Sequence, residues 1–213
     1  MAPFWFGAWN RRTDHVINML VKRDESFLLI VDVQEKLAPA VDGADRVVAN
    51  IVFLATAASR LGVPILITEH CPDRIGHTLP DILHASGNAK VVDKVHFCAQ
   101  SESVFTAALR RLDRGKPIIC GMEANVCVLQ TALGLKEAGY DPFVSTDAMA
   151  SRSTGDYATA LERFRQNGIE AVTCEMVVFE WLRRADTSEF RELLALIKKR
   201  PAGPGKQSPP IAN

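Results

Sequence analysis

Three reactive side chains follow short apolar runs in this sequence. Asp32 comes directly after the run 27–31, Lys94 ends a second run, and Cys127 lies shortly after the run 117–121. A cysteine thiolate is a nucleophile, a neighbouring ammonium stabilises it, and a carboxylate can take its proton and return it. An acid, an amine and a thiol in this arrangement predict a nucleophilic hydrolase.

Each of these side chains also has an ordinary structural explanation. Asp32 alone is compatible with a residue that caps a turn after a strand, and Lys94 alone is typical of a solvated surface. Cys127 lies near the start of an apolar helix, where it either packs in the core or has its thiol pKa lowered by helix amides and dipole. The coincidence of all three at strand ends favours a common site.

The elements that must position these residues alternate between strand-like and helix-like patterns. We expect strands over about 27–31, 63–68, 90–93, 117–120, 142–145 and 170–173. We expect helices over about 44–61, 81–85, 101–112, 125–138, 157–167, 176–183 and 188–199, with Ser101 as an N-cap. Strands and helices in alternation predict right-handed βαβ units and a parallel sheet. Ligands bind outside the carboxyl ends of such strands, so the three side chains can meet in one cleft.

Composition restricts the class of protein. The chain has 213 residues, 47% of them hydrophobic, which fits one globular domain. We expect an N-terminal extension over 1–25, the domain over 26–199 and a disordered tail over 200–213. With 25 basic and 25 acidic residues the formal charge is +0, so we expect no nucleic-acid or membrane partner. A charge near zero permits self-association, and we expect a homo-oligomer.

Several other features are missing from the sequence. No GxGxxG follows the first strand and there is no Walker A pattern, so we expect no nucleotide cofactor. No apolar run approaches the roughly 18 residues of a membrane span, and the N-terminus does not resemble a signal peptide. The five cysteines form no CxxC pair and have no zinc-type spacing. We therefore expect free thiols and a cytoplasmic protein.

Four segments of the sequence form a more specific pattern. They are Leu28-Leu29-Ile30-Val31-Asp32-Val33-Gln34, Asp93-Lys94-Val95-His96-Phe97, Gly121-Met122-Glu123-Ala124-Asn125-Val126-Cys127-Val128-Leu129-Gln130-Thr131-Ala132, and Asp147-Ala148 with Ser151-Arg152-Ser153. With these segments the chain resembles the isochorismatase-like cysteine hydrolase family over about 26–199. The cysteine segment is the most specific part, and it resembles the isochorismatase domain-containing proteins more than nicotinamidases.

The resemblance implies a three-layer αβα, Rossmann-like fold with a six-stranded parallel sheet in the order 3-2-1-4-5-6. It implies a catalytic triad of Asp32, Lys94 and Cys127. It also implies a cis peptide bond between Met122 and Glu123, and an oxyanion hole formed by the backbone amides of Glu123 and Cys127. Three residues in or beside the matching segments are expected to contact the substrate: Gln34, Phe97 and Cys98.

The sequence departs from the metal-binding members of the family. Nicotinamidases bind a metal through an Asp-x-His pair and a second histidine after strand two, whereas residues 68–73 here read Thr-Glu-His-Cys-Pro-Asp. We therefore expect no metal, and we interpret His70 and His77 as loop histidines near the pocket mouth; the alternative is that these two histidines meet at a metal. True isochorismatases do not need the cysteine for vinyl-ether hydrolysis, so Cys127 favours attack on a carbonyl group.

Three functions follow from this pattern. The first is a cysteine hydrolase that acts on a small-molecule amide or a related C–N bond, without a cofactor. The second is a catalytically silent binding module that keeps the triad. The third is a thiol redox protein in which Cys98 resolves an oxidised Cys127. Turnover of an amide distinguishes the first function from the other two.

Overall fold

The computed structural model describes residues 20–200. The predicted N-terminal extension falls outside the described residues except for 20–25, and the predicted tail falls outside them except for Arg200. The predictions for those two segments therefore stay predictions. Among the described residues, no helix combines the length and the apolar character needed to cross a membrane.

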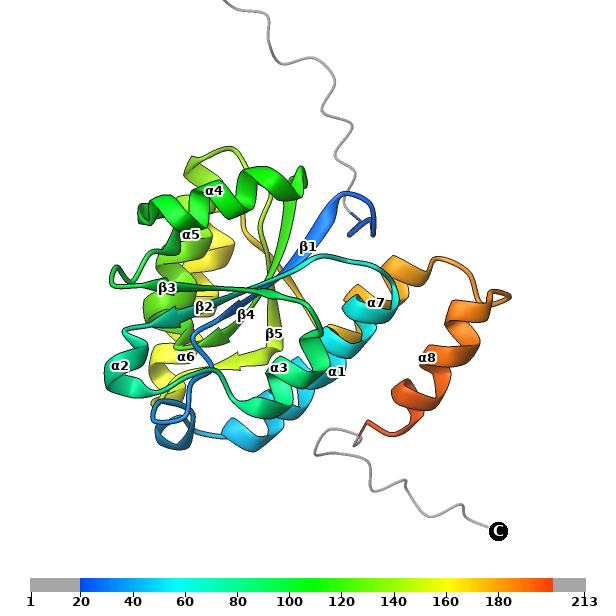
Figure 1. Cartoon of the computed structure of the whole chain (residues 1–213), viewed down its shortest axis with the longest axis horizontal. Helices are drawn as coiled ribbons and strands as arrows, with labels where there is room; N and C mark the ends of the chain where they lie inside the picture. The colour runs from blue at the N-terminus through cyan, green and yellow to red at the C-terminus, as the bar shows by residue number, and fades with distance from the viewer. Residues whose placement is uncertain (1–19, 201–213) are drawn as a thin grey trace, which may run out of the picture.

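The described residues form one parallel sheet with helices on both faces (Figure 1). The strands are β1 Ser26–Val31, β2 Ile65–His70, β3 Lys90–Lys94, β4 Lys116–Met122, β5 Phe143–Ala150 and β6 Glu170–Val172. Their order is β3-β2-β1-β4-β5-β6, with every neighbouring pair parallel. The predicted fold class and strand order are confirmed.

The helices occupy the connections between the strands. They are α1 Ala44–Arg60, α2 Pro72–Ile75, α3 Pro80–Ser86, α4 Ser103–Leu112, α5 Leu129–Glu137, α6 Thr154–Gln166, α7 Cys174–Leu182 and α8 Ser188–Lys198. Short 3-10 turns span Ala38–Ala40 and Ala99–Ser101, and a π-helical turn spans Ala124–Val128. The predicted helix over 125–138 is therefore two elements, and Cys127 lies in the first of them.

Strand β1 shows how the two cores form. Alternate side chains of a strand point to opposite faces of the sheet. Leu28 and Ile30 join the core beneath α1, α3, α7 and α8, whereas Phe27, Leu29 and Val31 join the core beneath α4, α5 and α6. All five side chains are fully buried, as expected for a central strand of a parallel sheet.

Three predicted boundaries were wrong. The strand predicted over 142–145 is β5, which continues to Ala150. Strand β2 continues to His70, because Glu69 pairs with Asp93 and His70 pairs with Lys94 of β3. His70 is therefore the last residue of a strand and not a loop residue. The predicted cap Ser101 lies in a 3-10 turn, and Glu102 is the N-cap residue of α4.

Gly121 allows β1 and β4 to approach closely where both strands end. It pairs with Val31 and has a φ of 125°. A β-carbon at this position would lie 2.0 Å from the carbonyl oxygen of Val31, so no larger residue fits. The close approach brings the end of β4 beside Asp32, the residue that follows β1.

Candidate active site

Asp32 occupies a constrained position at the end of β1. Its φ is 53°, a left-handed conformation that aspartate tolerates better than most residues. Its amide donates to the carbonyl of Thr68 at 3.0 Å, and the Thr68 hydroxyl donates to Asp32 Oδ1 at 2.7 Å. The side chain is fully buried. These contacts hold the carboxylate in place and leave Oδ2 facing other partners.

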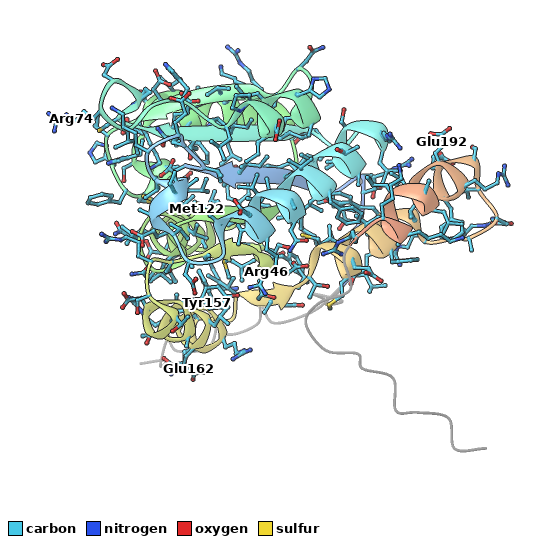
Figure 2. The ribbon with its side chains drawn as sticks, turned by 90° about the horizontal axis from the view of Figure 1, so that it is seen from below. Arg46, Arg74, Met122, Tyr157, Glu162 and Glu192 are labelled. Carbon is cyan, nitrogen blue, oxygen red and sulfur yellow. The ribbon has the colours of Figure 1, made fainter. Side chains whose placement is uncertain are left out.

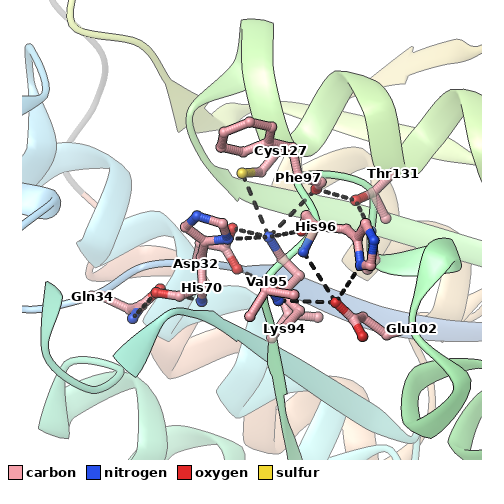
Figure 3. Close-up of polar contacts among 12 residues, drawn as sticks. Asp32, Gln34, His70, Lys94, Val95, His96, Phe97, Glu102, Cys127 and Thr131 are labelled. Atoms are coloured by element: carbon pink, nitrogen blue, oxygen red, sulfur yellow. Dashed lines mark hydrogen bonds and ion pairs between the residues drawn. The ribbon is translucent and has the colours of Figure 1, made fainter. Parts of the chain in front are cut away.

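Lys94 ends β3, and its ammonium lies inside the protein. The Nζ atom is 2.7 Å from Asp32 Oδ2, and neither side chain is exposed to solvent. The ammonium also donates to the carbonyl oxygens of His96 at 3.1 Å and Phe97 at 3.4 Å (Figure 3). A buried charge requires such pairing. The interpretation of Lys94 as a solvated surface lysine is therefore excluded.

Cys127 completes a contiguous cluster at the carboxyl edge of the sheet. Lys94 Nζ donates to Cys127 Sγ at 3.5 Å, and the cysteine is buried (Figure 3). The structure thus brings together Asp32, Lys94 and Cys127 from the ends of β1, β3 and β4. Within the described residues, Asp32 Oδ2 has its ionic contact with Lys94 but no aligned hydrogen bond. As part of a carboxylate, this oxygen can accept a proton.

The expectation that the Cys127 thiol has a lowered pKa was wrong. Burial raises the pKa of Cys127 to about 12, and the negative charge of Asp32 adds to the increase. The Lys94 ammonium lowers the pKa of Cys127, but by less than burial and the Asp32 charge together raise it. At neutral pH the resting side chain is therefore a thiol. Its nearest base is the Asp32 carboxylate.

The turn from Glu123 to Cys127 follows directly after β4. The Met122–Glu123 peptide bond is cis. The Glu123 carbonyl accepts from the amides of Val126 at 3.1 Å and Val128 at 3.2 Å, with no bond from the Cys127 amide between them. In the part of the chain that the structure describes, the Glu123 amide has no hydrogen-bond acceptor. The turn can therefore offer amides to a ligand.

Gln34 does not offer free donors to a ligand. Its Oε1 accepts from the amide of His70 at 2.7 Å. Its Nε2 donates to the carbonyls of His70 at 3.1 Å and Gly76 at 2.6 Å, so both amide protons are in use. The side chain is fully buried. Gln34 joins the ends of β1 and β2 to the loop after α2, which is a positioning role.

Phe97 lies at the edge of the site with its ring half exposed. It stacks on the ring of His70, with centroids 5.1 Å apart and an interplanar angle of 26°. In Figure 3 the Phe97 ring lies beside Cys127, and the His70 ring lies to the left of the Lys94 ammonium. His70 Nδ1 is 3.5 Å from Lys94 Nζ, and burial together with that ammonium lowers the pKa of His70. A substrate that reaches Cys127 meets an aromatic surface.

Cys98 packs against α5 at Gly134. Its Sγ atom lies 2.7 Å from where a β-carbon on Gly134 would be. Gly134 follows Cys127 by seven residues, which corresponds to about 10 Å along a helix axis. Cys98 and Cys127 are both free thiols in the structure. The predicted substrate contact by Cys98 has no support in this arrangement.

His70, at the end of β2, and His77, in the loop after α2, both have partners within the protein. His77 Nδ1 lies 2.9 Å from the buried carboxylate of Glu69, and this hydrogen bond raises the pKa of His77. His70 faces the Lys94 ammonium, which repels a cation. Among residues 20–200, no group of three or more histidine, cysteine, aspartate or glutamate side chains is placed to hold a metal ion.

Sequence reasoning missed the residues that hold the 95–97 loop. Glu102 Oε1 accepts from the amides of Val95 at 2.9 Å and His96 at 3.0 Å, and lies 2.8 Å from His96 Nδ1 (Figure 3). The His96 and Val95 amide bonds lower the pKa of Glu102 to about 2. The Thr131 hydroxyl donates to the carbonyl of Phe97 at 3.5 Å. An acidic residue in the first turn of the helix predicted over 101–112 was the available signal for Glu102.

A hollow of about 1000 Å³ lies elsewhere, and Asp32, Lys94 and Cys127 are not among the residues that line it. Its walls come from α1, β5, the start of α6, α7 and the end of α8, and they include Arg46, Asp147, Tyr157, Met176 and Arg200. Figure 2 labels Arg46 and Tyr157 on this wall. Its size does not make it the reactive site, because the buried acid, amine and thiol lie outside it.

Comparison with known proteins gives consistent matches. Residues 26–176 match the model of the isochorismatase family, which is described as "Isochorismatase domain". The chain is 36% identical over 172 residues to isochorismatase domain-containing protein 2 of Danio rerio, covering 81% of this chain and 86% of that protein. It superposes on the MAR1 ribonuclease of Caenorhabditis elegans with a TM-score of 0.81 and 30% identity, covering 89% of this chain and 99% of that one. The YcaC gene product of Escherichia coli, described as an octameric hydrolase of unknown specificity, has a TM-score of 0.75 and 22% identity, with coverage of 84% and 96%.

Proposed function

Since this chain belongs to the isochorismatase family, we propose that it is a cysteine hydrolase of small-molecule amides or related C–N bonds. Family membership supports a hydrolase. One observation favours the cysteine chemistry: the Lys94 ammonium contacts both the Asp32 carboxylate and the Cys127 sulfur inside the protein. The ion pair with Asp32 would suffice for a lysine with only a structural role, so the contact with the Cys127 sulfur supports a role in the chemistry.

In the proposed reaction, Cys127 Sγ attacks the carbonyl carbon of the amide while its proton moves to Asp32 Oδ2. The carbonyl electron pair moves to oxygen, and the amides of Glu123 and Cys127 donate to that oxyanion. When the intermediate collapses, the C–N bond breaks and the leaving nitrogen takes the proton from Asp32. A thioester on Cys127 remains.

The second half of the reaction returns the enzyme to its starting state. Asp32 takes a proton from a water molecule as that water attacks the thioester carbonyl. Collapse breaks the C–S bond, the acid leaves, and Asp32 returns the proton to the sulfur. Lys94 keeps its charge throughout and stabilises the thiolate and the carboxylate in turn. The raised pKa of Cys127 is compatible with this course, because the thiol loses its proton only as it reacts.

The surroundings of the triad suggest how a substrate is held. Phe97 supplies an exposed ring at the edge of the site, and we propose that it contacts the substrate. Gln34 acts indirectly, because its hydrogen bonds fix the ends of β1 and β2. Cys98 supports α5 and has no place in the reaction.

We extend the proposal to assembly and location. All five cysteines are free, which fits the reducing conditions of the cytoplasm. One structural neighbour is described as an octamer, and this chain has a formal charge of +0, which does not oppose self-association. A small-molecule substrate and a homo-oligomer are therefore the partners that we propose. We propose neither a cofactor nor a metal.

Release of ammonia or amine from a panel of small amides tests the function. The wild-type protein should turn over at least one member, and Cys127→Ala should abolish that turnover. Cys120→Ala is the matched control, because Cys120 is a buried thiol in β4 whose sulfur faces the carbonyl of Leu29. Persistent turnover by Cys127→Ala would overturn the proposal.

The same assay should include RNA, because one structural relative is named a ribonuclease. This chain lacks an excess of positive charge, which phosphate backbones require for long-range attraction. We therefore expect no RNA cleavage above that of the Cys127→Ala variant. RNA cleavage that depends on Asp32 and Lys94, with no amide turned over, would replace the amide proposal.

A further inference from the structure

Arg152 binds the side chain of Glu123, the residue whose amide we place in the oxyanion hole. The Arg152 amide donates to Glu123 Oε2 at 2.9 Å, and Arg152 Nε donates to Oε1 at 3.2 Å and Oε2 at 3.0 Å. The Glu123 side chain is only 9% exposed, whereas that of Arg152 is 66% exposed. A surface cation thus holds a buried carboxylate through charge-assisted hydrogen bonds.

The neighbouring residue makes a second connection to the same turn. The Ser151 hydroxyl donates to Asn125 Oδ1 at 2.7 Å. Ser151 and Arg152 follow directly after β5, which pairs with β4 through Met122 and Ala150. The segment after β5 therefore contacts the turn before Cys127 through two residues of that turn, Glu123 and Asn125.

We propose that Arg152 is a positioning residue that holds the Glu123–Cys127 turn with its amides directed at the reacting carbonyl. The inference rests on the proposed hydrolase function. Arg152 acts in two ways. It fixes the turn, and it neutralises a carboxylate whose negative charge would oppose the charge that develops on the oxyanion.

The geometry separates this effect from activation of the sulfur. The partners of the thiol are Lys94 and Asp32, which come from β3 and β1. The hydrogen bonds of the Arg152 side chain go to Glu123. Loss of Arg152 should therefore impair attack on a carbonyl group, and it should leave simple alkylation of the sulfur nearly unchanged.

Two reactions of Cys127 distinguish these effects without a known substrate. Acylation by p-nitrophenyl acetate passes through an oxyanion: the C–S bond forms, the ester C–O bond breaks, nitrophenolate leaves with the electron pair, and the thiol proton goes to Asp32. Alkylation by iodoacetamide displaces iodide at a saturated carbon and forms no oxyanion. Mass spectrometry of the Cys127 peptide gives both rates on the same protein.

Arg152→Gln should slow acylation of Cys127 by roughly tenfold to a hundredfold, since a misplacement of about 1 Å costs on the order of 10²-fold. Its alkylation rate should stay within about twofold of wild type. Arg152→Lys should recover part of the acylation rate, because it restores the charge but not the two-oxygen contact. Arg184→Gln is the matched control: Arg184 is 71% exposed and holds Asp186 through two hydrogen bonds of 2.9 and 2.6 Å.

Each other outcome has a distinct meaning. If wild-type Cys127 is acylated and Arg152→Gln is acylated at the same rate, the positioning role is overturned and the hydrolase proposal stands. If acylation and alkylation fall together with the melting temperature, Arg152 is only a structural residue. If the ester does not acylate wild-type Cys127, the hydrolase proposal and the role of Arg152 are both overturned.

Discussion

Lys94 Nζ and Asp32 Oδ2 are 2.7 Å apart, and both side chains are fully buried. A buried ion pair is weak evidence for stability, because apolar residues of similar volume often serve as well. Breaking such a pair on one side is costly, since it leaves a charge without a partner. The contact of the same ammonium with Cys127 suggests that the pair is present for chemistry.

Replacing one member of this pair should destabilise the protein. Asp32→Asn leaves the Lys94 ammonium uncompensated, and Lys94→Met leaves the Asp32 carboxylate uncompensated. Each should lower the free energy of unfolding by about 3–5 kcal/mol. The double variant should recover much of that loss because no buried charge remains. Urea denaturation of the three variants measures this, and losses that simply add would contradict a coupled pair.

The same substitutions should lower activity per folded molecule. Asp32→Asn removes the proton acceptor but keeps the side-chain volume, so kcat should fall roughly 10²- to 10⁴-fold. Lys94→Met should also lower kcat, and the combined loss should be smaller than the product of the single losses, since both act through one thiol. Steady-state kinetics should be normalised to the folded fraction. Unchanged kcat in Asp32→Asn would make Asp32 a structural cap.

Alkylation of Cys127 should depend steeply on pH. Because burial and Asp32 raise the pKa of Cys127 to about 12, the thiolate fraction and the iodoacetamide rate should rise about tenfold per unit between pH 6 and pH 9. Asp32→Asn removes a negative charge and should speed alkylation. Lys94→Met removes a positive charge and should slow it. Peptide-level labelling at several pH values gives these rates, and a plateau near pH 7 would show that the thiol pKa is low.

Glu102 should contribute a stability that disappears in acid. Hydrogen bonds from the His96 and Val95 amides lower the pKa of Glu102 from 4.5 to about 2 in the folded protein. A group with a lowered pKa stabilises the fold above its unfolded pKa, and the contribution is lost as the pH falls from about 4.5 towards 2. Glu102→Gln keeps an acceptor and removes the charge. Denaturation at pH 7, 5 and 3 should show a deficit in this variant that shrinks with decreasing pH; a deficit independent of pH would assign the effect to packing.

Oxidation should not join Cys98 to Cys127. Cys98 Sγ packs at Gly134 of α5, which follows Cys127 by seven residues, and both cysteines are free thiols in the structure. After mild peroxide treatment of the folded protein, non-reducing peptide mapping should show no disulfide between them. Rapid formation of this disulfide, with full protection against further oxidation, would favour the thiol redox function over the hydrolase.

The sequence predicted the fold and the meeting of the triad for one physical reason. In a parallel sheet all carboxyl ends lie at one edge, so residues that follow different strands are neighbours whatever their separation along the chain. Asp32 and Lys94 are 62 positions apart, and the register of β2 with its neighbours places them in contact. Strand order came from family resemblance, since an alternating pattern alone is compatible with several orders.

Properties that depend on burial were not predictable from sequence. The sign of the Cys127 pKa shift is set by how deeply the thiol lies and by the Asp32 charge, and helix position alone suggested the opposite. Gln34 follows Asp32 by two residues, yet its hydrogen bonds to His70 and Gly76 depend on how the loop after β2 folds back. The contact of Cys98 with Gly134 likewise depends on the packing of α5.

The most direct test of the account is a covalent adduct on Cys127 formed during turnover. An amide that the wild-type protein hydrolyses should be mixed with enzyme, quenched in acid within one turnover, and examined by peptide mass spectrometry. If Cys127 is the nucleophile, we expect the mass of the acyl group on the Cys127 peptide, a slower appearance in Asp32→Asn, and no adduct in Cys127→Ala. Turnover of the same amide with no acyl group on Cys127 at any time, and at an undiminished rate in Cys127→Ala, would contradict it.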